Sequence, residues 1–335
     1  MELYLDSADI DEIRKVSKLG FITGLTTTPT FMHRHGITDV DAAIIELSKL
    51  VDVLQIEALG SDADEIVKEA YRQEALGLDR KKTVYKIPIS MEGVKACKRL
   101  TNEGFLVNIH LVYTLQQAYM AMQAGATYVC PLVGRLQDQG HDALALVEQC
   151  VNAVNYYGYN TKIMFSSVRN AEHVRNAINI GVHTVTVPWK IMKQLTENNF
   201  TTIGTQQFEE HTRLMTVKVG DAIRDKNPVV KIDNTIADCL VEMTAGGYGA
   251  VTIVNDKNEA IGFFTDGDLR RLIEKGGEVK HVIKQSVDLK KPLTIGVDEL
   301  LIKAQELFTK HKVDELVVVD NNNKVVGLLD IQDLV

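Results

Sequence analysis

The 335-residue chain is predicted to be an α/β protein, in which a (β/α)8 TIM barrel is followed by a smaller α/β domain. Two observations predict this fold class. Up to about Met215, short β-branched apolar runs alternate with longer stretches of helical periodicity. Beyond that point, the sequence from residue 230 can be laid on the sequence from residue 295 with a constant offset of 65 and no gap. We therefore expect domains at residues 1–215 and 216–335, the second with tandem modules at about 216–278 and 279–335.

The first domain contains eight candidate strands, at residues 3–6, 21–25, 51–57, 83–88, 105–110, 128–133, 162–167 and 183–187. Periodic segments between them predict helices, most clearly at residues 61–75, 91–102, 114–124 and 141–157. Eight β/α units in this length favour a closed barrel near the lower end of its size range. The rival is an open doubly wound sheet, but no Gly-rich dinucleotide loop follows the first strand.

Composition excludes several function classes. The chain is 45% hydrophobic and 24% charged, which is typical of a folded soluble protein, and its net charge of −8 excludes the basic excess that nucleic acid or anionic lipid would attract. No basic leader or long apolar run is present, so we expect a cytoplasmic protein with no nucleic-acid or membrane partner. Four widely spaced cysteines predict buried thiols in a reducing compartment: Cys97, Cys130, Cys150 and Cys239.

Polar residues at the carboxyl ends of the predicted strands are the candidate catalytic groups, because the active site of a (β/α)8 barrel lies at that end. Asp6 ends the first strand and Glu57 ends the third. Lys86 lies just before the end of the fourth strand, and the fifth ends with Asn108 and His110.

Lys86 is the residue on which the predicted chemistry depends. Period-two alternation places Val84, Lys86 and Pro88 on one face of the strand. If this face points into the barrel, among few charges, burial favours the neutral amine, a nucleophile that condenses with carbonyl groups to a Schiff base. The alternatives are a lysine that extends outward to solvent, or one that is paired with Glu57.

Carboxylates and arginines follow other strands at the same rim. Asp6 and Glu57 could pass protons through a bound water, although Asp6 could instead cap the first helix. Arg135 follows the sixth strand, and Ser167 and Arg169 follow the seventh. Because guanidinium groups bind phosphate monoesters through two hydrogen bonds, these loops predict a phosphate site, with surface salt bridges as the alternative for each arginine.

The barrel sequence resembles the transaldolase family, particularly its small fructose-6-phosphate-aldolase-like branch. The motifs occur in family order: the opening Leu-Tyr-Leu-Asp-Ser-Ala-Asp, Thr26-Thr27-Thr28-Pro29-Thr30, Lys86-Ile87-Pro88, Pro131 to Arg135, and Ser167-Val168-Arg169. The resemblance implies a class I aldolase-type barrel, with Lys86 as the Schiff-base lysine and Asp6 and Glu57 as proton-transfer residues. The other residues that it implies form the substrate site, namely Thr26, Thr28 and Asn108 as substrate contacts and Arg135, Ser167 and Arg169 around the phosphate.

Two residues depart from the family pattern. Thr28 stands where the family usually has asparagine, which exchanges an amide for a shorter hydroxyl. His110 stands where the family usually has a threonine associated with the catalytic water. An imidazole there could replace that water as acid or base, or narrow the pocket. Both departures bear on the identity of the sugar more than on the lysine chemistry.

The duplicated domain resembles a pair of cystathionine-β-synthase (CBS) domains, most closely the pair attached to arabinose-5-phosphate isomerases. In its motif Gly-Phe-Phe-Thr-Asp-Gly-Asp, Thr265 and Asp268 match the residues that hold phosphate and ribose, which implies an adenine nucleotide or nucleotide-sugar effector. The second copy keeps Asp333 but has Asp330 in place of the threonine. An acidic residue there would repel phosphate, so we expect at most one good nucleotide site. The alternative is an oligomerisation module with degenerate sites.

Together these features predict a homo-oligomeric transaldolase that transfers a three-carbon dihydroxyacetone unit between a phosphorylated ketose and a phosphorylated aldose, as in pentose phosphate metabolism. We expect no cofactor and no metal to be required for catalysis. One alternative, favoured by Thr28 and His110, is an aldolase or transaldolase for a non-standard ketose phosphate in surface-polysaccharide sugar synthesis. Another is a catalytically silent sugar-phosphate or nucleotide sensor, against which the presence of Lys86, Asp6 and Glu57 argues.

Overall fold

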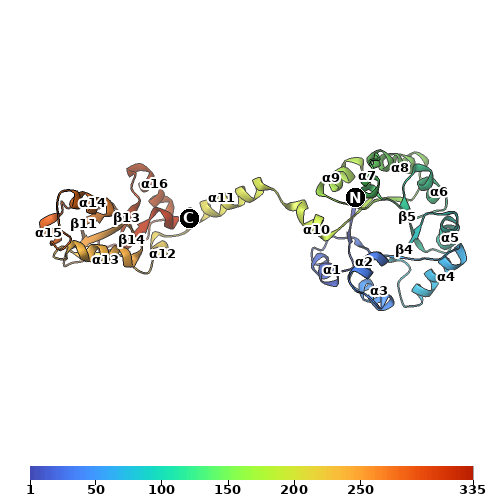
Figure 1. The fold of residues 1–335 in the computed structure, drawn as a ribbon, viewed down its shortest axis with the longest axis horizontal. Coiled ribbons are helices and arrows are strands. Elements are labelled where there is room, and N and C mark those ends of the chain that lie inside the picture. The colour runs from blue at the N-terminus through green and yellow to red at the C-terminus, as the bar shows by residue number, and fades with distance from the viewer. Residues whose placement is uncertain (335) are drawn as a thin grey trace. The chain divides into compact units, whose positions relative to one another are not determined.

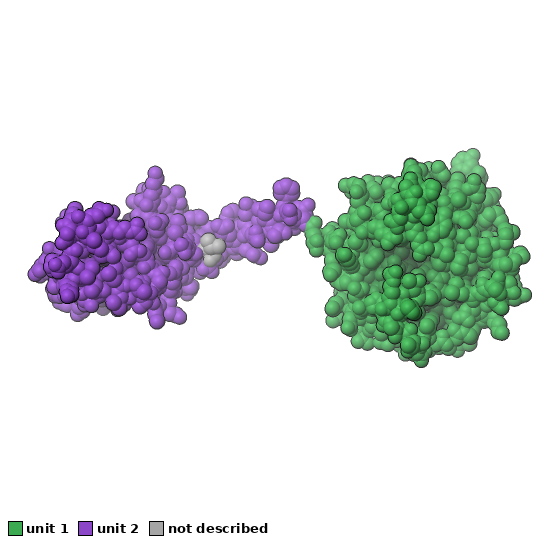
Figure 2. Space-filling view, in the orientation of Figure 1, with its two compact units in different colours: residues 1–197 green, residues 198–335 purple. Residues whose placement is uncertain are grey.

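The structure, a computed structural model, describes residues 1–334, and residue 335 lies outside the described residues. The chain divides into two compact units, Met1–Glu197 and Asn198–Val335 (Figure 2). Helix α11, Asn199–Thr216, belongs to the second unit, so this division falls before the junction predicted at residues 215 and 216. Among the described residues, no helix combines the length and the apolar character needed to cross a bilayer.

The first unit is a closed barrel of eight parallel strands in sequential order, with helices around it (Figure 1), so the predicted (β/α)8 architecture is confirmed. Its strands are β1 Glu2–Asp6, β2 Gly24–Thr26, β3 Val53–Glu57, β4 Thr83–Pro88, β5 Leu106–Val112, β6 Tyr128–Pro131, β7 Lys162–Phe165 and β8 Thr184–Val187. Its helices are α1 Ile10–Ser17, α2 Pro29–Arg34, α3 Val40–Ser48, α4 Ala63–Glu74, α5 Met91–Asn102, α6 Leu115–Gln123, α7 Val133–Asp138, α8 Ala143–Tyr157, α9 Ala171–Ile180 and α10 Trp189–Met192, followed by a 3-10 turn at Lys193–Thr196.

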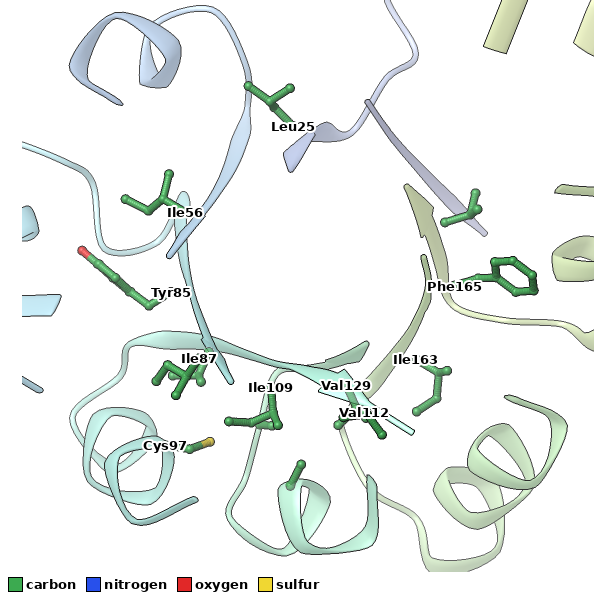
Figure 3. Packing of buried hydrophobic residues seen from close by; sticks show 14 of the residues in the cluster. Leu25, Ile56, Tyr85, Ile87, Cys97, Ile109, Val112, Val129, Ile163 and Phe165 are labelled. Atoms are coloured by element: carbon green, nitrogen blue, oxygen red, sulfur yellow. The ribbon is translucent and has the colours of Figure 1, made fainter. Parts of the chain in front are cut away.

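Side-chain alternation along the strands separates the outer core from the barrel interior. Tyr85, Ile87 and Ile109 point away from the barrel centre toward the helices (Figure 3) and belong to the main apolar core. The neighbouring positions point inward, where a smaller apolar cluster fills the barrel: Tyr4, Val84, Tyr128, Cys130 and Met164. The alternation predicted for the fourth strand is therefore confirmed, with the face that carries Lys86 directed into the barrel.

Local capping sets where the helices begin next to the mouth. Asp9 accepts hydrogen bonds from two backbone N–H groups at the start of α1, so Asp6 is not the cap of this helix and remains available to the barrel mouth. Thr28 caps α2 by accepting from the Phe31 N–H, and Pro29 occupies the first helical position. The strand-to-helix turns thus leave polar side chains at the rim.

The second unit contains two repeats, and the predicted duplication is confirmed element by element. The first repeat has β9 Val229–Lys231, α13 Ile236–Gly246, β10 Ala250–Val254, β11 Ala260–Thr265 and α14 Asp266–Glu274. The second has β12 Thr294–Gly296, α16 Leu301–His311, β13 Glu315–Val319, β14 Val325–Asp330 and a final 3-10 turn, Ile331–Leu334. Helices α12 Val219–Ala222 and α15 Ile283–Ser286 precede the two repeats.

Each repeat forms a three-stranded sheet, in the order β11-β10-β9 and β12-β13-β14. The segment that precedes each repeat, which we call its leading segment, packs on the other repeat. Leu214 and Val219, before the first repeat, lie in the core of the second, and Ile283, before the second repeat, lies in the core of the first. A third apolar cluster draws from both repeats and includes Tyr248 and Leu328. Neither repeat is therefore complete without the other.

Candidate functional site

A cavity of about 770 Å³ opens at the carboxyl ends of the barrel strands. Nine of the residues that the sequence singled out line it: Asp6, Thr26, Thr28, Glu57, Lys86, His110, Arg135, Ser167 and Arg169. The tenth, Asn108, is fully buried and does not line the cavity. The position of the candidate groups at one mouth follows from the parallel barrel, in which all strands end on the same side.

Lys86 is almost completely buried, with 5% of its surface exposed. Its Nζ lies 2.9 Å from Glu57 Oε1 and donates a hydrogen bond of 2.9 Å to the carbonyl oxygen of Thr27. The register of β3 and β4 pairs Glu57 with Lys86, so both side chains project from neighbouring strands on the same face. The expectation of few charges around the amine is therefore wrong, because a carboxylate on the adjacent strand contacts it.

Glu57 also faces His110, which the register of β4 and β5 pairs with Pro88. Glu57 Oε2 lies 2.9 Å from His110 Nε2. Although burial raises the pKa of Glu57, the charge of Lys86 and the contact with His110 hold it below its usual value. Burial lowers the pKa of His110, so the imidazole is neutral at pH 7. The pocket thus holds an ionised carboxylate between an amine and a neutral imidazole.

Asp6 occupies a different environment on β1. Its Oδ1 accepts a hydrogen bond of 2.8 Å from the Thr26 hydroxyl, and the Thr186 hydroxyl in turn contacts Thr26. Burial raises the pKa of Asp6, and neither the charge of Lys86 nor the hydrogen bond from Thr26 cancels this effect. The two carboxylates of the mouth are therefore shifted in opposite directions, which is the arrangement that separates a proton carrier from a permanently ionised group.

Two predicted substrate contacts have structural partners of their own. The Asn108 amide Nδ2 donates a hydrogen bond of 2.7 Å to Gln55 Oε1, while its Oδ1 has no hydrogen-bond partner within residues 1–334. The Thr28 Oγ accepts the Phe31 N–H at 3.3 Å, so its hydroxyl hydrogen is still available to the cavity. Contact of either side chain with substrate stays a prediction.

The predicted phosphate residues lie on the loops that follow β6 and β7. Arg169 Nη2 is 2.9 Å from Asp138, whereas the bond that Arg135 makes among the described residues is a long one of 3.4 Å to the Tyr113 hydroxyl. Gly134 lets the two loops approach each other, because a Cβ at this position would lie 2.1 Å from the Ser167 carbonyl oxygen. Ser167 itself has a left-handed φ of 60°, which is uncommon outside glycine and marks a constrained turn.

Sequence reasoning missed several groups in the cavity wall. Arg34 ends α2 and lines the cavity as a third arginine. Its signal was available, since it follows the second strand and the Thr-Thr-Thr-Pro segment at the same rim. Ser166, whose hydroxyl donates to the Pro131 carbonyl oxygen at 2.8 Å, and Cys130 complete the wall between β6 and β7. Burial raises the pKa of the Cys130 thiol to about 11, so it is a neutral group at pH 7.

In the second unit, a cleft of about 960 Å³ lies between the two repeats and contains Thr265 and Asp268. The two residues form a capping box at the start of α14, in which the Thr265 hydroxyl donates to Asp268 Oδ2 at 2.8 Å. Asp268 Oδ1 lies 2.6 Å from Arg271 and 3.4 Å from Lys290. We call this space the first cleft.

Asp333, the third predicted nucleotide contact, does not lie in the first cleft. Its Oδ1 lies 2.9 Å from Arg224 Nε. Sequence reasoning also missed Glu315 in the first cleft, where burial and neighbouring acidic residues raise its pKa to about 7. Within residues 1–334, no group of three or more His, Cys, Asp or Glu side chains is placed to hold a metal ion.

The fold and the mouth together define a (β/α)8 barrel with a buried lysine–carboxylate pair, joined to a CBS pair. A family profile described as transaldolase/fructose-6-phosphate aldolase matches residues 3–231, and the CBS domain profile matches residues 219–275 and 283–335. The chain belongs to the transaldolase/fructose-6-phosphate aldolase family.

Relatives with similar sequences cover the barrel. A probable transaldolase of Thermoanaerobacter sp. (strain X514) is 37% identical over 220 residues, which is 65% of this chain and 100% of the relative. Probable transaldolases of Geobacter metallireducens and Coprothermobacter proteolyticus are 37% and 38% identical over 62% of this chain, and 96% and 94% of their own lengths are covered.

Solved structures similar to this chain cover the CBS pair. A CBS domain pair/ACT domain protein from Thermotoga maritima is 20% identical and covers 35% of this chain and 93% of its own, with a TM-score of 0.30. A CBS domain protein from Pyrobaculum aerophilum, complexed with AMP, is 18% identical and covers 35% of this chain and 89% of its own, with a TM-score of 0.32.

The raised pKa of Asp6 predicts that this carboxylate destabilises the fold near neutral pH. In Asp6→Asn the amide oxygen can still accept from Thr26, but no charge is buried, so we expect the free energy of unfolding at pH 7 to rise by about 1–3 kcal/mol. The folded protein binds this proton more tightly than the unfolded chain, so the gain should vanish below about pH 4, grow as the pH rises from the unfolded-state pKa to the folded pKa, and stay constant above it. Thermal unfolding of both proteins between pH 4 and pH 8 measures it, and a variant that is less stable at pH 7 would contradict the assignment.

Proposed function

We propose that the barrel is a Schiff-base transaldolase that transfers a three-carbon dihydroxyacetone unit between phosphorylated sugars, and that the CBS pair binds an adenine-nucleotide-type effector. One observation carries the catalytic part: the buried Lys86 amine contacts Glu57 inside a cavity whose rim presents Arg34, Arg135 and Arg169. A primary amine at the base of such a pocket, with cations at its entrance, suits a ketose phosphate.

The first step is attack of Lys86 Nζ on the C2 ketone of the donor. The ammonium must first lose a proton, and Glu57 provides the route, since its two oxygens contact Lys86 and His110. The positive charge of Lys86 is one of the effects that lower the pKa of His110, so deprotonation of the amine strengthens the imidazole as a base. The resulting carbinolamine loses water to give an iminium ion.

Cleavage of the C3–C4 bond follows. A base removes the proton from the C4 hydroxyl, the aldehyde departs, and the iminium ion takes up the electron pair to give a bound three-carbon enamine. Asp6 is suited to this proton transfer because burial raises its pKa and makes it a stronger base than an ordinary carboxylate, whereas the pKa of Glu57 is lowered. The enamine then attacks the aldehyde carbon of a phosphorylated aldose, and hydrolysis of the new iminium ion releases the product.

Borohydride trapping tests the lysine chemistry. We expect incubation with fructose 6-phosphate followed by reduction to leave a dihydroxyacetone-derived adduct on the peptide that contains Lys86, because the iminium ion is reducible and C3–C4 cleavage removes the other three carbons. Mass spectrometry of the digested protein identifies the peptide.

The matched control is Lys86→Met with Glu57→Gln, since removing the lysine alone would leave a buried carboxylate without its cation. This double variant should keep the far-UV circular dichroism and give neither adduct nor turnover. An adduct on another lysine, or turnover by the double variant, would refute the assignment of Lys86.

Arg135 should recognise the phosphate. Arg135→Ala removes a guanidinium that makes no salt bridge among the described residues, so we expect KM for a phosphorylated donor to rise about 10- to 100-fold while KM for unphosphorylated dihydroxyacetone is unchanged. Arg175→Ala, which removes an exposed arginine on α9, is the control and should leave both values unchanged. An equal loss for the two donors would contradict a phosphate contact.

The same pocket supports a second candidate, an aldolase or transaldolase for a non-standard ketose phosphate. The observation that favours it is His110, whose imidazole lies in the cavity wall 2.9 Å from Glu57. A panel of donors and acceptors separates the two candidates. It includes surface-polysaccharide sugars, because the sequence motifs of residues 216–335 predict a CBS pair of the arabinose-5-phosphate isomerase type. A catalytically silent sensor would give no turnover with any donor.

The effector site is the first cleft. Asp268 can accept from ribose hydroxyls, and Lys290, Lys291 and Arg271 supply positive charge for phosphate. We expect AMP to bind the full chain at this cleft, and Asp268→Ala to weaken it at least 10-fold, as measured by isothermal titration calorimetry. Arg270→Ala, an exposed neighbour on α14, should bind AMP as the unmodified chain does. Undiminished binding by Asp268→Ala would place the nucleotide elsewhere.

A further inference from the structure

The internal duplication creates a second position related to the first cleft, and the structure shows it filled by the chain itself. A shift of 65 residues relates Asp333 to Asp268 and Asp330 to Thr265. In the second position, Asp333 Oδ1 accepts from Arg224 Nε at 2.9 Å, and its side chain is 13% exposed. We call the space around Asp333 the second cleft.

Arg224 makes three different contacts there. Besides its bond to Asp333, its Nη1 donates to the Gly247 carbonyl oxygen at 2.7 Å. Its guanidinium carbon also lies 4.3 Å from the centre of the Tyr248 ring, and Tyr248 is only 6% exposed. A planar group stacked on an aromatic ring and bonded to an aspartate makes the kinds of contact that a nucleoside makes through its base and ribose.

Asn227 links the backbone at Arg224 to the backbone of strand β14. The Asn227 Nδ2 donates to the Arg224 carbonyl oxygen at 2.6 Å, and its Oδ1 accepts from the Leu328 N–H at 2.8 Å. The Tyr248 hydroxyl donates to the Leu328 carbonyl oxygen at 2.9 Å. The segment that carries Arg224 is therefore fixed to β14 of the second repeat.

The first cleft has no counterpart of an arginine stacked on Tyr248. Tyr248 corresponds to Val313, 65 positions later, which has neither a ring nor a hydrogen-bond donor. The leading segments correspond with an offset of 64, because α12 begins at Val219 and α15 at Ile283, and this offset relates Arg224 to the acidic residue Asp288. The cations that contact Asp268 are instead Arg271 and Lys290, whose side chains are 58% and 70% exposed. The difference between an open first cleft and a filled second cleft thus depends on the leading segment of each repeat.

We propose that Arg224 is an internal occupant of the second cleft, which excludes a nucleoside and limits the pair to one ligand per chain. The expected stoichiometry of one ligand per chain rests on the proposed nucleotide function of the first cleft. The proposal that Arg224 excludes a nucleoside from the second cleft does not rest on that function. Removing the guanidinium would leave the Asp333 carboxylate for ribose and the Tyr248 ring for a base. Adenosine is the suitable probe, because Asp330 and Asp333 disfavour a phosphate.

The test is equilibrium dialysis of adenosine with the full chain and three variants. We expect about one adenosine per chain for the unmodified protein, two for Arg224→Ala, none for Asp268→Ala, and one again for Arg224→Ala with Asp268→Ala. The last variant is decisive, because its first cleft is disabled and only the second can bind. Added methylguanidinium should displace adenosine from it by refilling the place of the missing side chain. Arg270→Ala is the matched arginine control and should bind one adenosine.

The outcomes separate the two proposals. If the unmodified chain binds neither AMP nor adenosine, the nucleotide function fails, yet a gain of binding in Arg224→Ala would still support the exclusion. If the double variant folds and binds no adenosine, or if Asp268→Ala retains one adenosine per chain, the role of Arg224 is refuted. Arg224→Gln is the second variant should Arg224→Ala lose its thermal unfolding transition, and it must show the same gain.

Discussion

An ammonium group and a carboxylate share the closed end of the barrel mouth, and the side chains of Lys86 and Glu57 are only 6% and 7% exposed. Taking such charges out of water costs several kcal/mol for each ion, and their attraction offsets this only when the geometry is good. The register of β3 and β4 supplies that geometry, and the Thr27 carbonyl oxygen accepts a further proton of the ammonium. Any substitution that removes one partner leaves the other charge buried without its counter-ion, so Lys86 and Glu57 depend on each other.

The same pair keeps Glu57 ionised, so in the proposed mechanism Glu57 only relays a proton from Lys86 to His110, and the proton of the C4 hydroxyl needs another acceptor. The raised pKa of Asp6, on β1, fits that proposed role. Within residues 1–334, the hydrogen bond that the Asp6 side chain accepts comes from the Thr26 hydroxyl, which in turn contacts the Thr186 hydroxyl. The two carboxylates therefore differ because Glu57 contacts Lys86 and His110, whereas the effect of burial prevails at Asp6.

Most of the fold and the placement of the barrel residues could be predicted from the sequence, because alternation along β4 and the shared direction of parallel strands are local consequences of the chain. Pairing of Lys86 with Glu57 was one of the alternatives that the sequence left open, and the expectation of few charges failed because the register between β3 and β4 is not visible in either strand alone. Glu315 belongs to no repeating pattern, whereas Arg34 could have been found from its place after the second predicted strand. Strands β9 and β12, each three residues long, are too short for periodicity to reveal.

The CBS pair shows that a repeated backbone does not imply a repeated site. The two sheets superimpose in sequence without a gap, yet their leading segments differ, because the fifth residue after the start of α12 is Arg224 and the fifth after the start of α15 is Asp288. Arg213 of α11 also donates to the Asp333 carbonyl oxygen at 3.1 Å, so the filled cleft is bonded to the helix that precedes the pair. The segment 247–249 has one end bonded to Arg224 and the other in the wall of the first cleft. The filled cleft therefore holds fixed one side of the open one, and only the open cleft is lined by exposed cations that can rearrange around a ligand.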